Sequence, residues 1–221
     1  MLADEAPACR PILRSHPRSL LLLLPLLAGC ARDPIELECP LIEPGALVVT
    51  ELRGAQSGTD TWGQWIELYN TTDQPLALAG VRVVMMKLDG SGRTELLVRA
   101  RGTQVAAGGY FVLGRFEDSE RPDHVDYGWR PDFESDLYAS GLVEVWACEQ
   151  QGEELAYREL DELVYEGLPT AGSLAFDGAL EPSADANDEE SDWCIDDTAY
   201  ELEPGQVGLP GTPGAANPPC E

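Results

Sequence analysis

A carboxylate between two aromatic residues is the first candidate for chemistry in this sequence. Glu67 lies between Trp65 and Tyr69 in the run WIELYN, and a carboxyl group beside aromatic rings can serve as a general acid or base. In a strand, however, the period of two places Ile66 and Leu68 on one face and Glu67 on the other. With the aliphatic pair toward the core, Glu67 points outward. We therefore interpret Glu67 as a strand residue without a catalytic role.

His124 is the second candidate, because a histidine titrates near neutral pH and often acts as a general base. It lies in a polar, turn-rich stretch, and the sequence contains no G-x-S-x-G nucleophile motif, no H-E-x-x-H zinc motif and no lysine-bearing phosphate loop. We expect His124 to be a solvated loop residue. The sequence predicts no catalytic residue, no cofactor and no enzymatic activity.

An acidic loop is the third candidate, because Ca²⁺ takes six to eight hard oxygen ligands. The stretch DANDEESDWCIDD (185–197) offers the candidate ligands Asp185, Asn187, Asp188, Glu190 and Asp192. Its spacing departs from an EF-hand, since Glu190 stands where glycine is required and Asp196 where glutamate is usual. A solubilising acidic loop is the alternative, and we prefer it to a metal site.

Residues 1–29 have the pattern of an export signal. Three arginines precede the apolar run SLLLLLPLLAG, which is shorter than the roughly 20 residues that a membrane-spanning helix needs. The run ends in Leu-Ala-Gly-Cys30 and resembles the lipobox of bacterial lipoproteins. This resemblance implies cleavage before Cys30 and attachment of a diacylglyceryl group, and hence of fatty acids such as palmitate, to its sulfur. The alternative is an ordinary secretory signal followed by an incidental cysteine.

Four cysteines follow Cys30, and an even number in an oxidising compartment predicts two disulfides with three possible pairings. We favour Cys148 with Cys194 and Cys39 with Cys220, the second of which would tie the two ends of the domain together. A zinc site is the competing interpretation. It is disfavoured because no two of these cysteines have C-x-x-C spacing and His124 is the one histidine after the leader.

Short runs rich in β-branched and aromatic residues, separated by turn residues, indicate an all-β fold. The chain has 22 Gly, 17 Pro and 43% hydrophobic residues, which suits a globular domain with many turns. Seven strands with turn signals between them favour a β-sandwich. The predicted strands are 46–52, 65–70, 81–88, 94–100, 109–116, 142–148 and 159–166.

The order of several short motifs resembles the lamin tail domain. These are W-I-E-L-Y-N-x-x-x-x-P-L-x-L-x-G, then A-A-G-G-Y-F-V-L, and G-T-P-G-A-A-N near the end. The resemblance implies an immunoglobulin-like sandwich over residues 46–217, in which WIELYN is framework and Asn70 leads into the following turn. Two long polar insertions, 116–136 and 177–192, depart from a compact member of the family, and local function would most readily lie there. Residues 30–45 would form the lipidated N-terminus and tether.

The formal net charge of −26 repels nucleic acid, so no nucleic-acid partner is expected. The sequence predicts a non-enzymatic lipoprotein of the bacterial cell envelope, attached to the membrane through Cys30. The outer membrane is its expected location, and its role is to scaffold or bind another envelope or extracellular component. The alternative is an accessory module of an extracellular hydrolase or nuclease system, with calcium as a possible ligand of the acidic loop.

Overall fold

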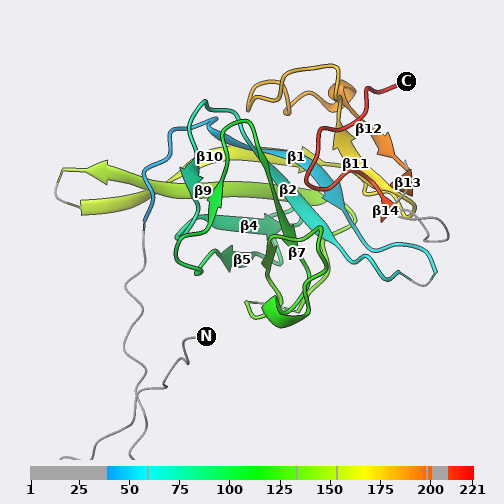
Figure 1. The fold of residues 1–221 in the computed structure, drawn as a ribbon, viewed down its shortest axis with the longest axis horizontal. Coiled ribbons are helices and arrows are strands. Elements are labelled where there is room, and N and C mark those ends of the chain that lie inside the picture. The colour runs from blue at the N-terminus through cyan, green and yellow to red at the C-terminus, as the bar shows by residue number, and fades with distance from the viewer. Residues whose placement is uncertain (1–38, 59, 133, 153, 198, 201–208) are drawn as a thin grey trace, which may run out of the picture. The chain divides into compact units, whose positions relative to one another are not determined.

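The computed structural model describes residues 39–221 except 59, 133, 153, 198 and 201–208. These described residues form an all-β fold and contain no α-helix. They include two short 3₁₀ turns, η1 (Asp118–Glu120) and η2 (Glu190–Asp192). Residues Glu36–Glu221 belong to one compact unit. Most of its strands lie in two sheets (Figure 1).

The larger sheet has six strands in the order β12-β11-β1-β2-β7-β8. Its neighbours are antiparallel except β7 and β8, which are parallel. In chain order these strands are β1 (Leu47–Arg53), β2 (Trp65–Asn70), β7 (Tyr110–Gly114), β8 (Tyr127–Gly128), β11 (Ser173–Phe176) and β12 (Trp193–Asp196).

The smaller sheet has four antiparallel strands in the order β10-β9-β4-β5. These are β4 (Arg82–Met86), β5 (Thr94–Leu97), β9 (Gly141–Gln151) and β10 (Glu154–Tyr165), and β9 and β10 form a long hairpin that extends beyond the neighbouring strands (Figure 1). Two further antiparallel pairs join β3 (Leu76–Ala77) to β6 (Gln104–Val105) and β13 (Ala199–Tyr200) to β14 (Leu209–Pro210).

The two larger sheets share one hydrophobic core. The period-two pattern of β2 confirms the expected inward face, since Ile66 and Leu68 belong to this core together with Val83 of β4 and Val143 of β9. Side chains alternate across a strand, so the residues between them face the other side of the sheet. Each of the seven strands predicted from the sequence overlaps an observed strand.

The first predicted polar insertion, 116–136, is in part a core segment and not a surface loop. Trp129 is fully buried in the main core, with Tyr127 beside it. The Tyr127 hydroxyl donates to the Leu97 carbonyl oxygen at 3.1 Å, and the Trp129 amide donates to the Gly114 carbonyl at 2.9 Å. The insertion therefore closes one end of the core between β7 and β5.

Asp161 joins the two sheets at a pair of bulges. The register of β1 shifts between Val49 and Glu51, and that of β10 shifts between Glu159 and Asp161. Asp161 Oδ2 accepts the amide hydrogen of Val49 at 2.8 Å. A bulge leaves backbone groups outside the ladder, and here a buried carboxylate satisfies one of them.

The strands β11 and β12 were not predicted from the sequence. Both are four residues long, and β12 lies within the acidic stretch 185–197. β11 pairs with the free edge of β1, and β12 pairs with β11. Their strand conformation therefore depends on long-range pairing, which a local pattern does not reveal.

Candidate functional site

Cys30, the proposed lipid attachment site, lies outside the described residues, as do the predicted signal segment 1–29 and the first part of the tether 30–45. In the part of the chain that the structure describes, no helix has the length and apolar character needed to span a membrane.

The four later cysteines form two disulfides, but the favoured pairing of Cys148 with Cys194 and Cys39 with Cys220 is wrong. The bonds join Cys39 to Cys148 and Cys194 to Cys220. The segment around Leu41 forms a parallel bridge with β9 at Cys148, and the Cys148 amide donates to the Pro40 carbonyl at 3.1 Å. The first bond therefore joins the N-terminal end of the domain to β9, and the second joins the C-terminal end to β12. Neither bond joins the two ends to each other.

Glu67 is buried and does not point into solvent, which corrects the expectation from its strand. Glu67 and Glu51 are direct partners on β2 and β1, and both side chains are 0% exposed. The C-terminal segment 211–217 covers them: the Gly214 amide donates to Glu67 Oε2 at 2.6 Å, and the Thr212 amide donates to Glu51 Oε1 at 3.2 Å. Neither carboxyl group is open to a substrate.

The covering segment is tied to the sheet by buried polar side chains. Asn217 donates to the carbonyl oxygens of Thr50 and Phe176 at 2.9 and 3.0 Å, and the Thr212 hydroxyl bonds to Asp196 at 3.2 Å. Gly211 has φ +113°, and a Cβ there would collide with the Glu51 carboxyl group. The close approach of backbone to carboxylate therefore requires glycine at this position.

Burial raises the pKa of both glutamates. The pKa of Glu51 rises to about 7 because the buried carboxylate loses its hydration, an effect that hydrogen bonds from Ser173 and Thr212 partly offset. The pKa of Glu67 lies well above its usual value for the same reason and because Glu51 is adjacent. The pair therefore holds protons more tightly in the folded protein than in the unfolded chain.

His124 is half-buried in an aromatic cluster, so the expectation of a solvated loop histidine is wrong. Its ring packs edge-on against Trp62 and Trp65, with centroids 5.9 and 5.5 Å apart, and Nε2 lies 3.0 Å from the Trp62 carbonyl oxygen. Burial lowers the pKa of His124. These contacts give the histidine a packing role.

The candidate calcium ligands of the acidic loop, which we interpreted as a solubilising loop, do not converge in the described structure. Asn187 is buried, and its Nδ2 donates to the Val49 carbonyl and to Asp161 Oδ2 at 3.1 and 2.9 Å. Among Asp185, Asp188, Glu190 and Asp192, no three carboxylates approach within 4.8 Å of one another. Asn187 thus anchors the acidic loop to the two bulges and is turned away from solvent.

Asn187→Ala is expected to lower the free energy of unfolding by about 2 kcal/mol, because it removes the buried hydrogen bonds from Asn187 to the Val49 carbonyl and to Asp161. Urea unfolding followed by circular dichroism measures the change. Asp185→Ala, at an exposed position of the same loop, is the matched control and should change stability by less than about 0.5 kcal/mol. Equal effects of the two substitutions would contradict this role of Asn187.

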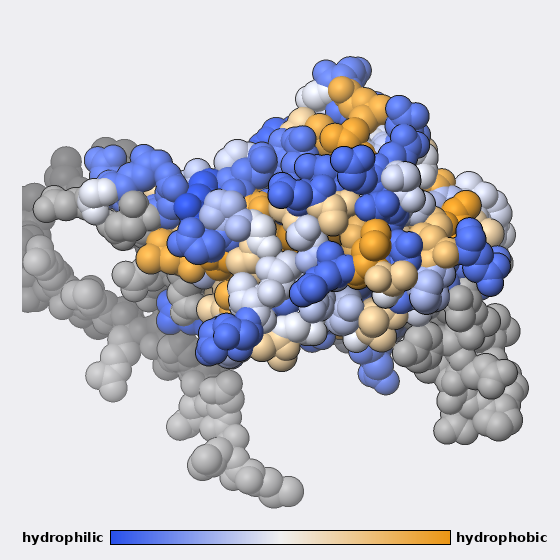
Figure 2. Space-filling model, turned by 90° about the horizontal axis from the view of Figure 1, so that it is seen from above, coloured by the Kyte–Doolittle hydropathy of each residue, from blue (hydrophilic) through white to orange (hydrophobic). Residues whose placement is uncertain are grey.

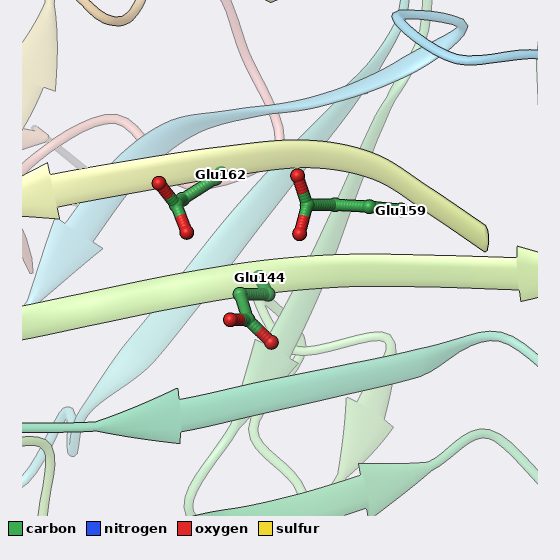
Figure 3. A group of neighbouring side chains, drawn as sticks. All are labelled: Glu144, Glu159 and Glu162. Atoms are coloured by element: carbon green, nitrogen blue, oxygen red, sulfur yellow. The ribbon is translucent and has the colours of Figure 1, made fainter. Parts of the chain in front are cut away.

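A carboxylate group that sequence reasoning missed lies on the hairpin, where Glu144 of β9 and Glu159 and Glu162 of β10 gather on one face (Figure 3). Their ligand oxygens lie within 4.8 Å of one another, and within the described residues this is the one group of at least three His, Cys, Asp or Glu side chains with that geometry. Burial, followed by repulsion from Glu162 and Glu144, raises the pKa of Glu159. Only the pairing of β9 with β10 brings these residues together, so spacing along the chain gives no signal.

These features define the class of the molecule as an all-β domain with two disulfides and a buried carboxyl pair beneath its C-terminal segment. Among known proteins, no family model matches the chain, and no curated protein matches it.

Proposed function

We propose that this protein is a non-enzymatic lipoprotein of the bacterial cell envelope that serves as a binding or structural module. One observation carries the proposal: all four cysteines that follow Cys30 are joined in disulfides. Disulfides form and persist in oxidising compartments outside the cytosol. A cysteine directly after the apolar leader then has the position of a lipid attachment site, and the outer membrane is the proposed location.

Three features support a domain of lamin-tail, immunoglobulin-like type. Two sheets enclose one core. Asn70 is buried at the end of β2 and bonds to the carbonyl oxygens of Gln74 and Ala106 at 2.7 and 2.8 Å, so it fixes the turn that follows. The segment containing G-T-P-G-A-A-N packs over Glu67, which links two of the motifs that carry the resemblance.

The proposed lack of enzymatic activity is supported by how the candidate side chains are used. Glu67 and Glu51 are enclosed beneath the C-terminal segment, and His124 packs against indole rings. On the face shown in Figure 2, hydrophilic residues are interspersed with groups of apolar ones. Such a surface suits an exported module that stays in solution beside its membrane.

Cys30→Ser is expected to remove the protein from the membrane, because the hydroxyl group cannot form the thioether that carries the diacylglyceryl group. The test is fractionation of salt-washed envelopes from a bacterial host that expresses either form. The unchanged protein should remain with the membranes, and the variant should be unprocessed or soluble.

Cys9→Ser is the matched control, since Cys9 precedes the apolar leader and would be removed with it. Its product should fractionate like the unchanged protein. A Cys30→Ser protein that is still processed and still membrane-bound after the salt wash would refute the anchor.

A further inference from the structure

A hollow of about 400 Å³ lies at the end of the six-stranded sheet, between the loop that follows β1 and the loop that precedes β11. Several polar side chains line it beside a larger share of apolar surface. Its lining includes the side chains of Arg53, Gln56, Ser57, Trp62, Thr170 and Asp197. Its volume falls in the range of about 300–1,000 Å³ that is usual for small-molecule sites.

A buried ion pair fixes one wall of the hollow. The Arg53 side chain is 2% exposed, and its guanidinium donates to both carboxylate oxygens of Asp60 at 2.9 and 3.1 Å. The same guanidinium lies 4.8 Å from the ring of Trp65 and donates to the Gly63 carbonyl. Asp60 also accepts the Trp62 amide hydrogen at 3.0 Å. A bidentate pair on a buried guanidinium ties Asp60, and through it the Trp62 backbone, to β1.

Hydrogen bonds between the two loops fix the opposite wall. Gln56 Nε2 donates to the carbonyl oxygens of Gly54 and Gly172 at 3.1 and 3.0 Å. The Ser57 amide donates to the Thr170 carbonyl at 2.8 Å. Because both walls are held by the protein itself, a ligand would lose little free energy in ordering the site.

The remaining groups match the chemistry of a sugar. Trp62 is half-buried, and indole faces pack against the C–H face of a pyranose ring. The hydroxyl groups of Ser57 and Thr170 make no hydrogen bond within the described part of the chain, so they are available to sugar hydroxyls. We propose that this hollow binds a saccharide.

The charge of the hollow selects among saccharides. Asp60 neutralises Arg53, whereas Asp197 is exposed and makes no ion pair with any residue that the structure describes. The hollow therefore carries one uncompensated negative charge. An amine-bearing sugar gains a charge-assisted hydrogen bond there, a neutral sugar is accepted, and an acidic sugar is repelled. The inference names a ligand class for the binding role proposed above, and it is independent of the lipid anchor.

The test titrates the full chain, solubilised in detergent, with three disaccharides built from glucosamine, N-acetylglucosamine or glucuronic acid. Indole fluorescence and saturation-transfer NMR report binding. We expect the first two sugars to bind and the acidic sugar not to bind. Trp62→Ala should weaken both interactions about tenfold. Asp197→Asn, at an exposed position, should weaken binding of the glucosamine disaccharide about fivefold and leave the neutral sugar unchanged.

Two further variants keep the test decisive if Trp62→Ala disturbs the aromatic cluster. Thr170→Arg, at an exposed position, fills the hollow and should abolish binding of both sugars. Trp146→Ala removes an indole from the hairpin, away from the hollow, and should leave both affinities unchanged.

Absence of saturation transfer from both neutral and amine sugars would overturn the proposal. Binding that survives Thr170→Arg would also overturn it. Because the titration does not depend on Cys30, its failure would leave the proposed anchor standing, and failure of the anchor would leave this site standing.

Discussion

Replacing Cys39 and Cys148 together by serine is expected to lower the free energy of unfolding by about 5 kcal/mol. The bond joins residues separated by 109 positions, and in the chain-entropy model the constraint on the unfolded chain grows with the logarithm of that length. The bond also holds the segment around Leu41 against β9. Urea unfolding of the double variant, followed by circular dichroism, measures the loss.

Cys194→Ser with Cys220→Ser is the matched comparison. This bond spans 26 positions, so its removal should cost about 3.5 kcal/mol. Peptide mapping without reduction should recover Cys39 linked to Cys148 and Cys194 linked to Cys220. A linked peptide that joins Cys148 to Cys194 would contradict the pairing, and a larger loss from the shorter loop would contradict the entropic explanation.

Raising the pH from 5 to 8 is expected to destabilise the domain, chiefly through Glu51 and Glu67. A carboxyl group with a folded pKa above its unfolded value contributes stability that is complete below the unfolded pKa and is lost as the pH rises through the folded pKa. For Glu51 these values are 4.5 and about 7, so the loss falls between pH 4.5 and 8. It amounts to roughly 3 kcal/mol from Glu51 alone.

Neighbouring carboxylates raise the pKa values of Glu51 and Glu67 further. Asp196 raises the pKa of Glu51, and Asp126 raises that of Glu67. Hydrogen bonds from Ser173 and Thr212 lower the pKa of Glu51, and those from Gly214 and Thr50 lower that of Glu67, but burial outweighs them. Burial also raises the pKa of Asp161 to about 6. Ionisation of that residue therefore adds to the loss over the same range.

Glu51→Gln is the decisive variant for the pH dependence, because the amide keeps the shape of the side chain and does not ionise. Unfolding free energies measured by urea titration at pH 5 and pH 8 should differ much less in this variant than in the unchanged protein. High salt controls for general repulsion within a chain of net charge −26, since salt screens surface charges far more than buried ones. An unchanged pH dependence in Glu51→Gln would contradict the assignment.

Local patterns were sufficient to predict seven of the strands and the inward face of β2. Ile66 and Leu68 alternate with polar and aromatic neighbours, and this alternation depends only on strand geometry. The turn after Asn70 was likewise predicted, because its side chain bonds within a few residues of itself.

Contacts between distant parts of the chain could not be predicted in the same way. Glu67 is buried by a segment 147 positions away, and Asn187 turns inward to meet Val49, which is 138 positions away. In the sequence, the alternation along β2 indicates exposure for Glu67, and the polarity of the acidic stretch indicates it for Asn187. The pairing of Cys39 with Cys148 depends in the same way on where the N-terminal segment meets β9.

The proposal that this protein is a lipid-anchored envelope module is tested most directly by mass spectrometry of its mature N-terminus. The protein should be purified from the membrane fraction of a bacterial host that expresses the full chain. We predict that the N-terminal peptide begins at Cys30 and carries a diacylglyceryl group on that residue. An N-terminal peptide that begins elsewhere, or that begins at Cys30 without lipid, would contradict the account.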